Sequence, residues 1–337
     1  GDVVVDDNAT KSITTITLNG FADATLGAGA SGSLNKLATL NLKNGQATGT
    51  TTLTSTVATL NVTLDDMAGT VDLDGAAATT LKTLNLTTTG EASTITLDAA
   101  KVETLTIAAG ADLDVSTSVA AGLAAVKTIT VTGAGDVNLG NLSTVASFTT
   151  LTASAATGNI TASVDGDVTA VTTGSGDDSI TLLTTTSFDK AINLGAGDDT
   201  LTLTAGTTVV PTAAVNGGAG TDTISMTFAS ADAYDATENF KNAISGFERL
   251  EINNVYTGGN ADTEDTLTLD LANLGFTSYV ITSGTLIDTD AGESDILKLT
   301  KLAANATVVL TAEGYIEAVL ATATGNTDVI NVIVDAT

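Results

Sequence analysis

The amino-acid sequence predicts an all-β protein with the fold of a parallel β-solenoid. Three observations predict it. A short unit of alternating apolar and polar residues recurs at intervals of 20 to 24 residues, Thr makes up roughly one residue in five, and the 337-residue chain contains a single Pro. β-Branched Thr suits strands, and scarce Pro suits a chain whose backbone N–H groups join a continuous hydrogen-bond ladder.

The recurring unit has the pattern apolar-x-Thr-apolar-Asn/Thr-apolar. It is clearest as LATLNL, VATLNV, LKTLNL and VETLTI, and its copies start at residues 13, 37, 57, 81, 102, 126, 148 and 168. The alternation has the two-residue period of a β-strand. A rung of this length cannot bury its apolar side alone. We therefore expect successive rungs to stack, with Leu, Val and Ile inside and Thr, Asn and Asp outside.

The composition excludes several classes of function. The chain has 39 acidic and 11 basic residues, a net charge of -28, and no His or Cys. Without His and Cys it cannot build a catalytic triad, a His-based acid–base pair or a zinc site of the usual type, so we expect no enzyme. Its negative charge would repel nucleic acid and anionic membranes, and no apolar run is long enough for membrane insertion. The many carboxylates of the chain instead favour binding of a hard divalent cation.

Three segments in the middle of the chain share a Gly-rich turn followed by Asp and an apolar strand. They read TGSGDDSI from Thr173, LGAGDDTL from Leu194 and GGAGTDTI from Gly217. The third matches G-G-x-G-x-D-x-U, where U is a large apolar residue, and the first two differ only at the first Gly. Gly permits the positive φ values of a tight turn and a close approach of backbone carbonyls, so that the Asp points between stacked turns.

Oxygen atoms from adjacent turns of this kind can surround a Ca²⁺ ion at about 2.3–2.6 Å. Because three stacked turns enclose two gaps, we predict at least two Ca²⁺ ions, with Asp178, Asp199 and Asp222 as the main carboxylate ligands. Asp177 and Asp198 are weaker candidates, because that position often points to solvent. The alternative is a structural Gly–Asp turn without metal, which the repulsion between stacked carboxylates disfavours. The glycines that form the turns are Gly174, Gly176, Gly195, Gly197, Gly218 and Gly220.

Weaker acidic segments occur elsewhere in the chain. The segment from Asp290 to Asp295 pairs a Gly turn with carboxylates before a strand, and both of these residues are candidate Ca²⁺ ligands. The segments Asp65–Asp66 and Asp72–Asp74 fit either a further cation site or a solvated charged face, and we favour the charged face. Similar Gly–Asp turns occur at residues 132–136, 259–265 and 325–328.

The rhythm of the repeats divides the chain into three parts. Residues 1–170 carry the Thr-rich solenoid repeats, and residues 171–226 form the predicted calcium-binding β-roll. Residues 227–337 begin with a helix or loop interruption and continue as a second solenoid segment. In the interruption, Phe240 and Ile244 belong to a set with the i, i+4, i+7 spacing of a helix. We interpret the chain, which shows no signal peptide, as a fragment or a processed form.

The sequence resembles the central and C-terminal part of RTX-type surface-layer (S-layer) proteins of Gram-negative bacteria. The resemblance rests on the three Gly–Asp turns, on the LxTLNL units and on the segment ISGFERLEI (residues 244–252), which is similar to a G-F-E-x-L-x-[IV] segment that follows RTX blocks. It implies a structural protein that leaves the cell by type I secretion, folds on binding extracellular Ca²⁺ through RTX turns and self-assembles into a two-dimensional lattice. The chain lacks an obvious anchoring domain, through which such a protein would contact cell-surface polysaccharide.

Three other functions fit parts of the sequence. An RTX adhesin or biofilm-matrix segment has the same motifs, and only the absence of ordered sheets would distinguish it from a lattice protein. A polysaccharide lyase or epimerase on a β-helix usually needs clustered Arg, Lys, His or Tyr, whereas this chain has one Arg, no His and four Tyr. Ice binding needs regular Thr-x-Thr rows, and the frequent Asn residues and unequal rung lengths predict irregular rows.

Overall fold

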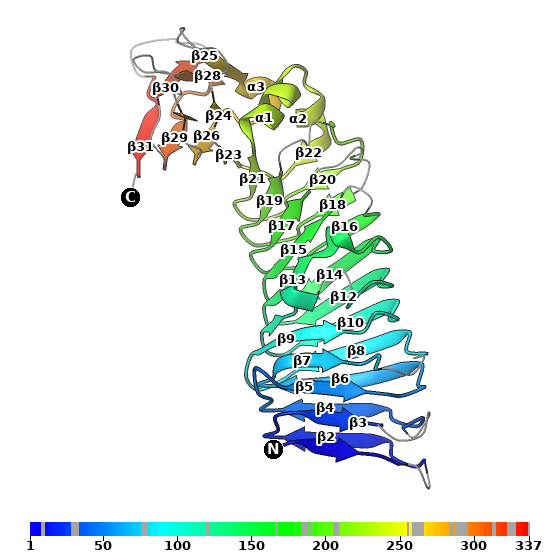
Figure 1. The fold of residues 1–337 in the computed structure, drawn as a ribbon. Helices are drawn as coiled ribbons and strands as arrows, with labels where there is room; N and C mark the ends of the chain where they lie inside the picture. Colours follow the sequence, from blue (N-terminus) through cyan, green and yellow to red (C-terminus); the bar gives the residue numbers. More distant parts are fainter. Residues whose placement is uncertain are drawn as a thin grey trace. The chain divides into compact units, whose positions relative to one another are not determined.

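The computed structural model of the chain is a parallel β-solenoid (Figure 1), which confirms the predicted all-β fold class. Consecutive strands from β1 to β23 alternate between two parallel sheets. The structure describes residues 1–7, 11–27, 34–75, 80–118, 122–165, 168–183, 188, 191–204, 209–254, 256–257, 266–283, 286–287, 296–311, 315–321 and 328–335.

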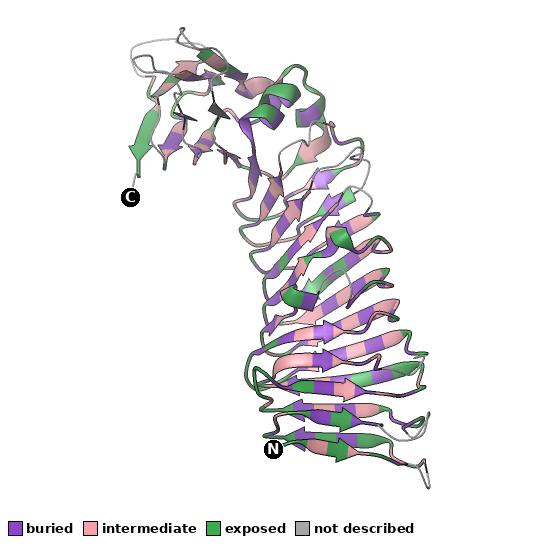
Figure 2. Cartoon of the chain, in the orientation of Figure 1, coloured by how far each residue is buried: buried purple, intermediate pink, exposed green. Residues whose placement is uncertain are grey.

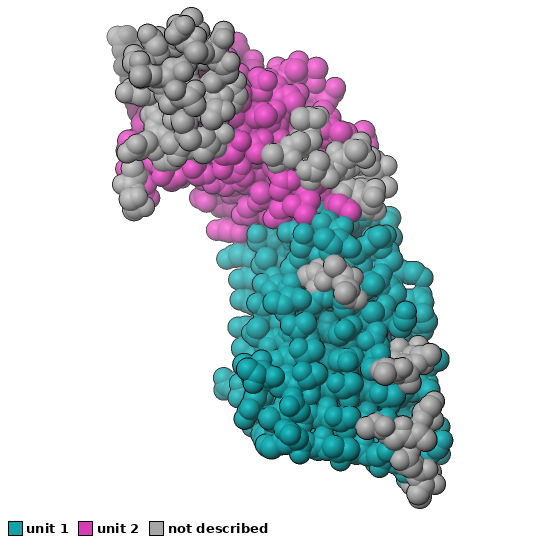
Figure 3. All heavy atoms as spheres, viewed as in Figure 1, with its two compact units in different colours: residues 1–164, 168–179 teal, residues 165–167, 180–337 magenta. Residues whose placement is uncertain are grey.

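The chain divides into two compact units, which are coloured separately in Figure 3. Unit 1 comprises Gly1–Val164 and Val168–Ser179, and unit 2 comprises Asp165–Asp167 and Ile180–Thr337. Strand β17 (Ser179–Leu182) starts at the division.

Each rung of unit 1 contributes one strand to each of two parallel sheets. The order in the first sheet is β1 (Val3–Val5), β3 (Ala24–Leu26), β5 (Thr50–Leu53), β7 (Ala68–Asp72), β9 (Ser93–Asp98), β11 (Leu113–Asp114), β13 (Val137–Asn141) and β15 (Ile160–Val164). The order in the second sheet is β2 (Thr15–Asn19), β4 (Thr39–Lys43), β6 (Thr59–Asp65), β8 (Thr83–Thr88), β10 (Thr104–Ala109), β12 (Thr128–Gly133), β14 (Thr150–Ala156) and β16 (Ala170–Thr172). Short 3-10 helices, η1 (Ser116–Ser118) and η2 (Leu142–Thr144), follow β11 and β13. Every copy of the recurring unit overlaps one strand of the second sheet, so its interval is the length of one rung.

Apolar side chains form columns inside unit 1. In the second sheet, five residues at the same register position of successive strands are fully buried, namely Leu60, Leu84, Leu105, Ile129 and Leu151. Figure 2 shows the resulting alternation of buried and less buried residues along the strands. Because burying one such side chain contributes about 1.5–3 kcal/mol, stacked columns of this kind stabilise the rungs against one another.

The strands of the second sheet in unit 1 carry few charges on their outward face, and an ion-paired row of Lys82, Glu103 and Lys127 lies just before β8, β10 and β12. Among the described strands of this sheet the charged residues are Lys43 and Asp65, whose side chains form an ion pair at 2.6 Å. The strands of the first sheet, by contrast, carry Asp72, Asp98 and Asp114. An unbroken row on the outward face of the second sheet consists of Thr59, Thr83, Thr104, Thr128 and Thr150.

Unit 2 has the same two-sheet arrangement with added helices. One sheet contains β19 (Thr200–Leu203), β21 (Thr223–Met226), β23 (Arg249–Ile252), β26 (Tyr279–Thr282), β29 (Thr307–Leu310) and β31 (Asn331–Val334), in this order. The other contains β18 (Ala191–Asn193), β20 (Val215–Asn216) and β22 (Ile244–Ser245). Two smaller sheets pair β24 (Tyr256–Thr257) with β27 (Leu286–Ile287), and β25 (Thr266–Asp270) with β28 (Ile296–Leu302) and β30 (Tyr315–Leu320).

Helices α1 (Phe228–Asp235) and α2 (Asn239–Ala243) lie where the rhythm of the repeats breaks, and α3 (Leu271–Leu274) follows β25. The rings of Tyr234 and Phe240 stack with centroids 4.3 Å apart, and both side chains are fully buried. These two aromatic residues therefore form the apolar contact between α1 and α2. Within the described part of the chain, no helix has both the length and the apolar character needed to span a membrane.

Candidate cation-binding site

The glycines of the three Gly–Asp turns lie where the backbones of successive rungs approach closely. Gly218 has a φ of +121°, and a Cβ at this position would lie 2.0 Å from the carbonyl oxygen of Gly195. A Cβ at Gly174 would lie 2.0 Å from the carbonyl oxygen of Ala156, although its φ is outside the left-handed region. Residue 218 must therefore be Gly both because of its backbone conformation and because a side chain would clash. At residue 174 only the clash requires Gly. A Cβ at Gly176 would also meet backbone, and positive φ values recur at Gly195, Gly197 and Gly220.

The two Asp positions of the motif have different environments. Asp178, Asp199 and Asp222 are buried, with at most 1% of their surface exposed. Asp177 and Asp198, each one residue earlier in the chain than a buried Asp, are exposed. The apolar residue two positions after each buried Asp lies in the core: Ile180, Leu201 and Ile224.

In unit 1, the Asp178 carboxylate joins its own turn to the preceding rung. Its Oδ1 accepts the backbone N–H of Ile160 at 2.7 Å, and its Oδ2 accepts the N–H of Gly174 at 3.2 Å. Burial raises the pKa of this carboxyl, while hydrogen bonds from the Thr173 side chain and from the two N–H groups act in the opposite direction. Asp178 is thus held in place by local donors.

In unit 2, acidic side chains from three successive rungs form a column, which we call the carboxylate column: Asp199, Asp222 and Glu248. Oδ1 of Asp222 accepts the N–H of Asp199 at 2.8 Å, and the N–H of Asp222 donates to Oε2 of Glu248 at 2.9 Å. The registers of β19 with β21 and of β21 with β23 place these residues at equivalent positions. The column therefore places one carboxylate on each of three successive rungs.

The second carboxylate oxygen of Asp222 lacks a hydrogen-bond donor among the described residues. This Oδ2 is buried and accepts no hydrogen bond from any described residue. Burial raises the pKa of Asp222, the charges of Glu248 and Asp198 raise it further, and the N–H of Asp199 lowers it. Leaving a buried acceptor unpaired costs about 1–3 kcal/mol. A bound cation would satisfy this oxygen and favour the charged form, so the residues present fit a Ca²⁺ ion.

The exposed Asp position belongs to a structural ladder. Oδ1 of Asp112 accepts the N–H of Asp136 at 2.9 Å, and Oδ1 of Asp136 accepts the N–H of Asn159 at 2.7 Å. Asn159 continues the ladder by accepting the N–H of Asp177 at 2.7 Å. In unit 2, Asp198 accepts a backbone N–H of the next rung at 2.8 Å in the same way. These side chains cap backbone donors along the turns, which explains their regular spacing.

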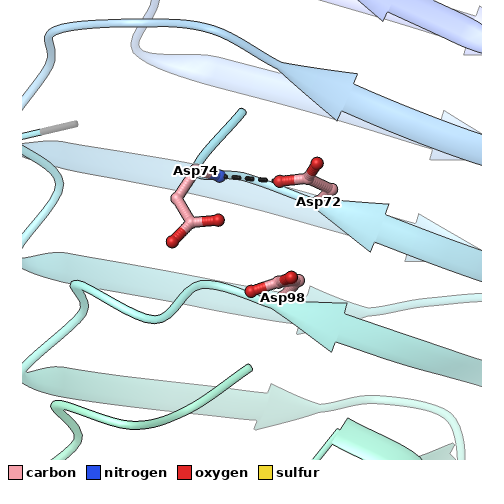
Figure 4. A group of neighbouring side chains, drawn as sticks. All are labelled: Asp72, Asp74 and Asp98. Carbon is pink, nitrogen blue, oxygen red and sulfur yellow. Dashed lines mark hydrogen bonds between the residues drawn. The ribbon is translucent and has the colours of Figure 1, made fainter. Parts of the chain in front are cut away.

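A further acidic cluster lies in the first sheet of unit 1, at the ends of β7 and β9 (Figure 4). One carboxylate oxygen of each of Asp72, Asp74 and Asp98 lies within 4.8 Å of the others. Oδ1 of Asp72 accepts the N–H of Asp74 at 3.0 Å. Burial is the main cause of the raised pKa values of Asp72 and Asp98, and neighbouring carboxylates add to it. All three residues are half-buried and offer their oxygens to a cation from the solvent side.

Sequence reasoning found some of these residues and missed others. It singled out Asp72–Asp74 but not Asp98, because their proximity depends on the register of β7 with β9. It included Glu248 only in the segment that resembles RTX proteins. The pattern Gly–x–Glu, two residues before an apolar strand residue, could have identified Glu248 as an equivalent of the motif Asp. The candidate ligands Asp290 and Asp295 lie outside the described residues, as do residues 259–265.

Comparison with known proteins identifies no relative. Neither a protein-family profile, nor a curated protein, nor a solved structure matches this chain.

Proposed function

We propose that this chain is a structural segment of a bacterial surface layer, which folds on binding extracellular Ca²⁺ and self-assembles into a two-dimensional lattice. The observation that carries the proposal is the carboxylate column of unit 2, where Oδ2 of Asp222 is buried without a hydrogen-bond partner. An ion bound there would join rungs that are distant in sequence. Folding and ion binding would then be coupled.

The charge of the chain supports this coupling. A net charge of -28 opposes the compact state through self-repulsion, and bound divalent cations would reduce that repulsion. An ion that binds only the folded state at 100 times its dissociation constant stabilises that state by about 2.7 kcal/mol. We propose that the chain remains poorly folded where Ca²⁺ is scarce, is exported by type I secretion, and folds at the cell surface.

The sparsely charged outward face of the second sheet in unit 1 supports self-assembly. Two copies of a chain with this net charge repel each other, and the repulsion between local charges is smallest where a face carries few unpaired charges. The row from Thr59 to Thr150 provides such a face over five strands. The lattice partner is thus a second copy of the chain.

Negative-stain electron microscopy of the purified chain tests the proposal. We expect ordered two-dimensional sheets in millimolar CaCl₂ and none in chelator or in NaCl of equal ionic strength. Sheets that form equally well in chelator would contradict the role of Ca²⁺. Dispersed particles in every condition, from a chain that Ca²⁺ nevertheless stabilises, would support the adhesin or matrix segment instead.

A further inference from the structure

The rung that follows the third Gly–Asp turn lacks the motif but keeps an acidic residue at the equivalent position. Gly246-Phe247-Glu248 precedes β23 just as Gly220-Thr221-Asp222 precedes β21. Oε2 of Glu248 accepts the N–H of Asp222 at 2.9 Å, and Oδ1 of Asp222 makes the same contact with the rung before it. Glu248 therefore extends the carboxylate column beyond the three turns with a longer side chain.

Oxygen atoms of these two rungs lie on the same side of Gly217. A Cβ added to Gly217 would lie 2.0 Å from the carbonyl oxygen of Gly246 and 2.8 Å from Oδ2 of Asp222. Only Gly fits at this position, because a Cβ would overlap the Gly246 carbonyl, and both oxygens therefore approach the same side of Gly217. A Ca²⁺ ion binds carboxylate and carbonyl oxygens at about 2.3–2.6 Å, so the two oxygens are of the right kind and on the right side of the turn.

The two carboxylates differ in a way that suits a cation site. Asp222 is fully buried, and its Oδ2 lies beside Gly217 without a hydrogen-bond donor among the described residues. Glu248 is exposed, so the site has access to solvent, and waters can complete the six to eight oxygens that Ca²⁺ requires. We infer that Asp222, Glu248 and the carbonyl of Gly246 bind a Ca²⁺ ion in addition to the two that three stacked turns predict.

This ion would act on the segment between its two carboxylate ligands. The chain leaves the sheet after β21, forms α1 and α2, and returns through β22 to Glu248, which lies 26 residues after Asp222. Because the ion binds only where the two ends of this segment meet, it stabilises the folded segment by linkage. The ion would thereby tie the helical interruption to the end of the Gly–Asp block. The inference rests on the proposed binding of Ca²⁺ by the carboxylate column.

Counting bound ions in Glu248→Gln tests the inference. Gln has nearly the same length and its amide oxygen can still accept the N–H of Asp222, but it lacks the charge. Glu251→Gln is the matched control, because Glu251 lies three residues further on and bonds to the hydroxyls of Ser225 and Ser283. Equilibrium dialysis against CaCl₂ should find one ion fewer in Glu248→Gln than in the wild type and no change in Glu251→Gln. In chelator, Glu248→Gln should melt at the wild-type temperature.

A second variant, Gly217→Ala, keeps every carboxylate, but its Cβ displaces the Gly246 carbonyl. Gly217→Ala should lose the same single ion, and circular dichroism in chelator checks that both variants fold. An unchanged ion count in Glu248→Gln would overturn the inference while leaving Ca²⁺ binding by the Gly–Asp turns intact. A wild-type chain that binds no Ca²⁺ would overturn the inference together with the proposed function.

Discussion

At the residue scale, Asp222 combines two properties that rarely coexist in a metal-free protein. It is fully buried, and one of its oxygens has no hydrogen-bond donor among the described residues. The other oxygen caps the N–H of Asp199, so the side chain is also part of the turn. Asp178 is as deeply buried, but both of its oxygens accept backbone N–H groups. The two residues occupy the same position of the Gly–Asp motif, but only Asp222 has an oxygen that a cation would satisfy.

The substitution Asp222→Asn should have opposite effects with and without Ca²⁺. Asn keeps an oxygen for the N–H of Asp199 but removes the buried charge. In chelator we expect the variant to be at least as stable as the wild type. In saturating Ca²⁺ we expect it to lose about 2–3 kcal/mol of the stabilisation that the ion provides. Thermal unfolding followed by circular dichroism measures both effects.

The control for this variant is Asp112→Asn, which changes an exposed carboxylate of unit 1 that caps the backbone N–H of Asp136. It should shift the Ca²⁺-induced stabilisation by less than about 0.5 kcal/mol. If Asp222→Asn kept the full Ca²⁺ effect, Asp222 would be a structural turn residue and not a ligand.

The pH dependence of the same variant follows from the raised pKa of Asp222, of which burial is the main cause. The folded chain binds this proton more tightly than the unfolded chain. The stabilisation that this tighter proton binding gives the wild type is thus present below the ordinary Asp pKa of about 3.9. It is lost as the pH rises through the raised pKa of the folded chain. In chelator, the free energy of unfolding of Asp222→Asn should exceed that of the wild type most at neutral pH. The difference should shrink as the pH falls, and a constant difference from about pH 4 to pH 7 would contradict the assignment.

At the element scale, the strands of the second sheet in unit 1 are the best-predicted part of the fold. Each recurring unit has the alternation of a strand, and each overlaps one strand of that sheet. The sequence predicted irregular Thr rows because the rungs differ in length. The row from Thr59 to Thr150 is nevertheless unbroken, because these residues pair in register and the extra residue of β14 comes after Thr152. The neighbouring row mixes Asn61 and Asn85 with Thr106.

Other elements depend on contacts that a linear pattern does not contain. Strand β11 has only two residues, too few for a visible alternation. The three carboxylates of Asp72, Asp74 and Asp98 meet because β7 and β9 pair in one register. The contact of Glu248 with Asp222 likewise spans two helices and 26 residues. Local motifs therefore predicted the turns, whereas the partners across rungs required the structure.

Charge placed on the outward face of the second sheet should prevent assembly without unfolding the chain. The double variant Thr130→Glu with Thr152→Glu adds two negative charges to this face. Each substitution at an outward strand position costs less than about 1 kcal/mol of stability. We expect a melting temperature near that of the wild type in Ca²⁺ and a loss of sheets by electron microscopy.

The control for the face adds the same charges to the first sheet of unit 1. Thr94→Glu with Thr161→Glu changes two exposed Thr residues of β9 and β15. This variant should assemble like the wild type. Equal assembly of both double variants would exclude the outward face of the second sheet as the contact between copies.

At the scale of the whole molecule, the excess of acidic residues links stability to the ionic conditions. Monovalent salt screens a charge of -28 in general, whereas Ca²⁺ can also bind specific oxygens. The two effects differ in concentration dependence, because screening by NaCl requires about 0.1 M, where the Debye length is near 10 Å. Specific binding acts at the much lower concentrations set by its dissociation constant.

The central claim is that Ca²⁺ binding is coupled to folding, and a Ca²⁺ titration of the melting temperature tests it most directly. The wild-type chain is melted at increasing free Ca²⁺ from chelator to millimolar, with MgCl₂ and NaCl at matched ionic strength as controls. The account predicts a melting temperature that rises with the logarithm of the Ca²⁺ concentration and exceeds that in either control. A melting temperature that is the same in chelator, CaCl₂ and the matched salts would contradict it.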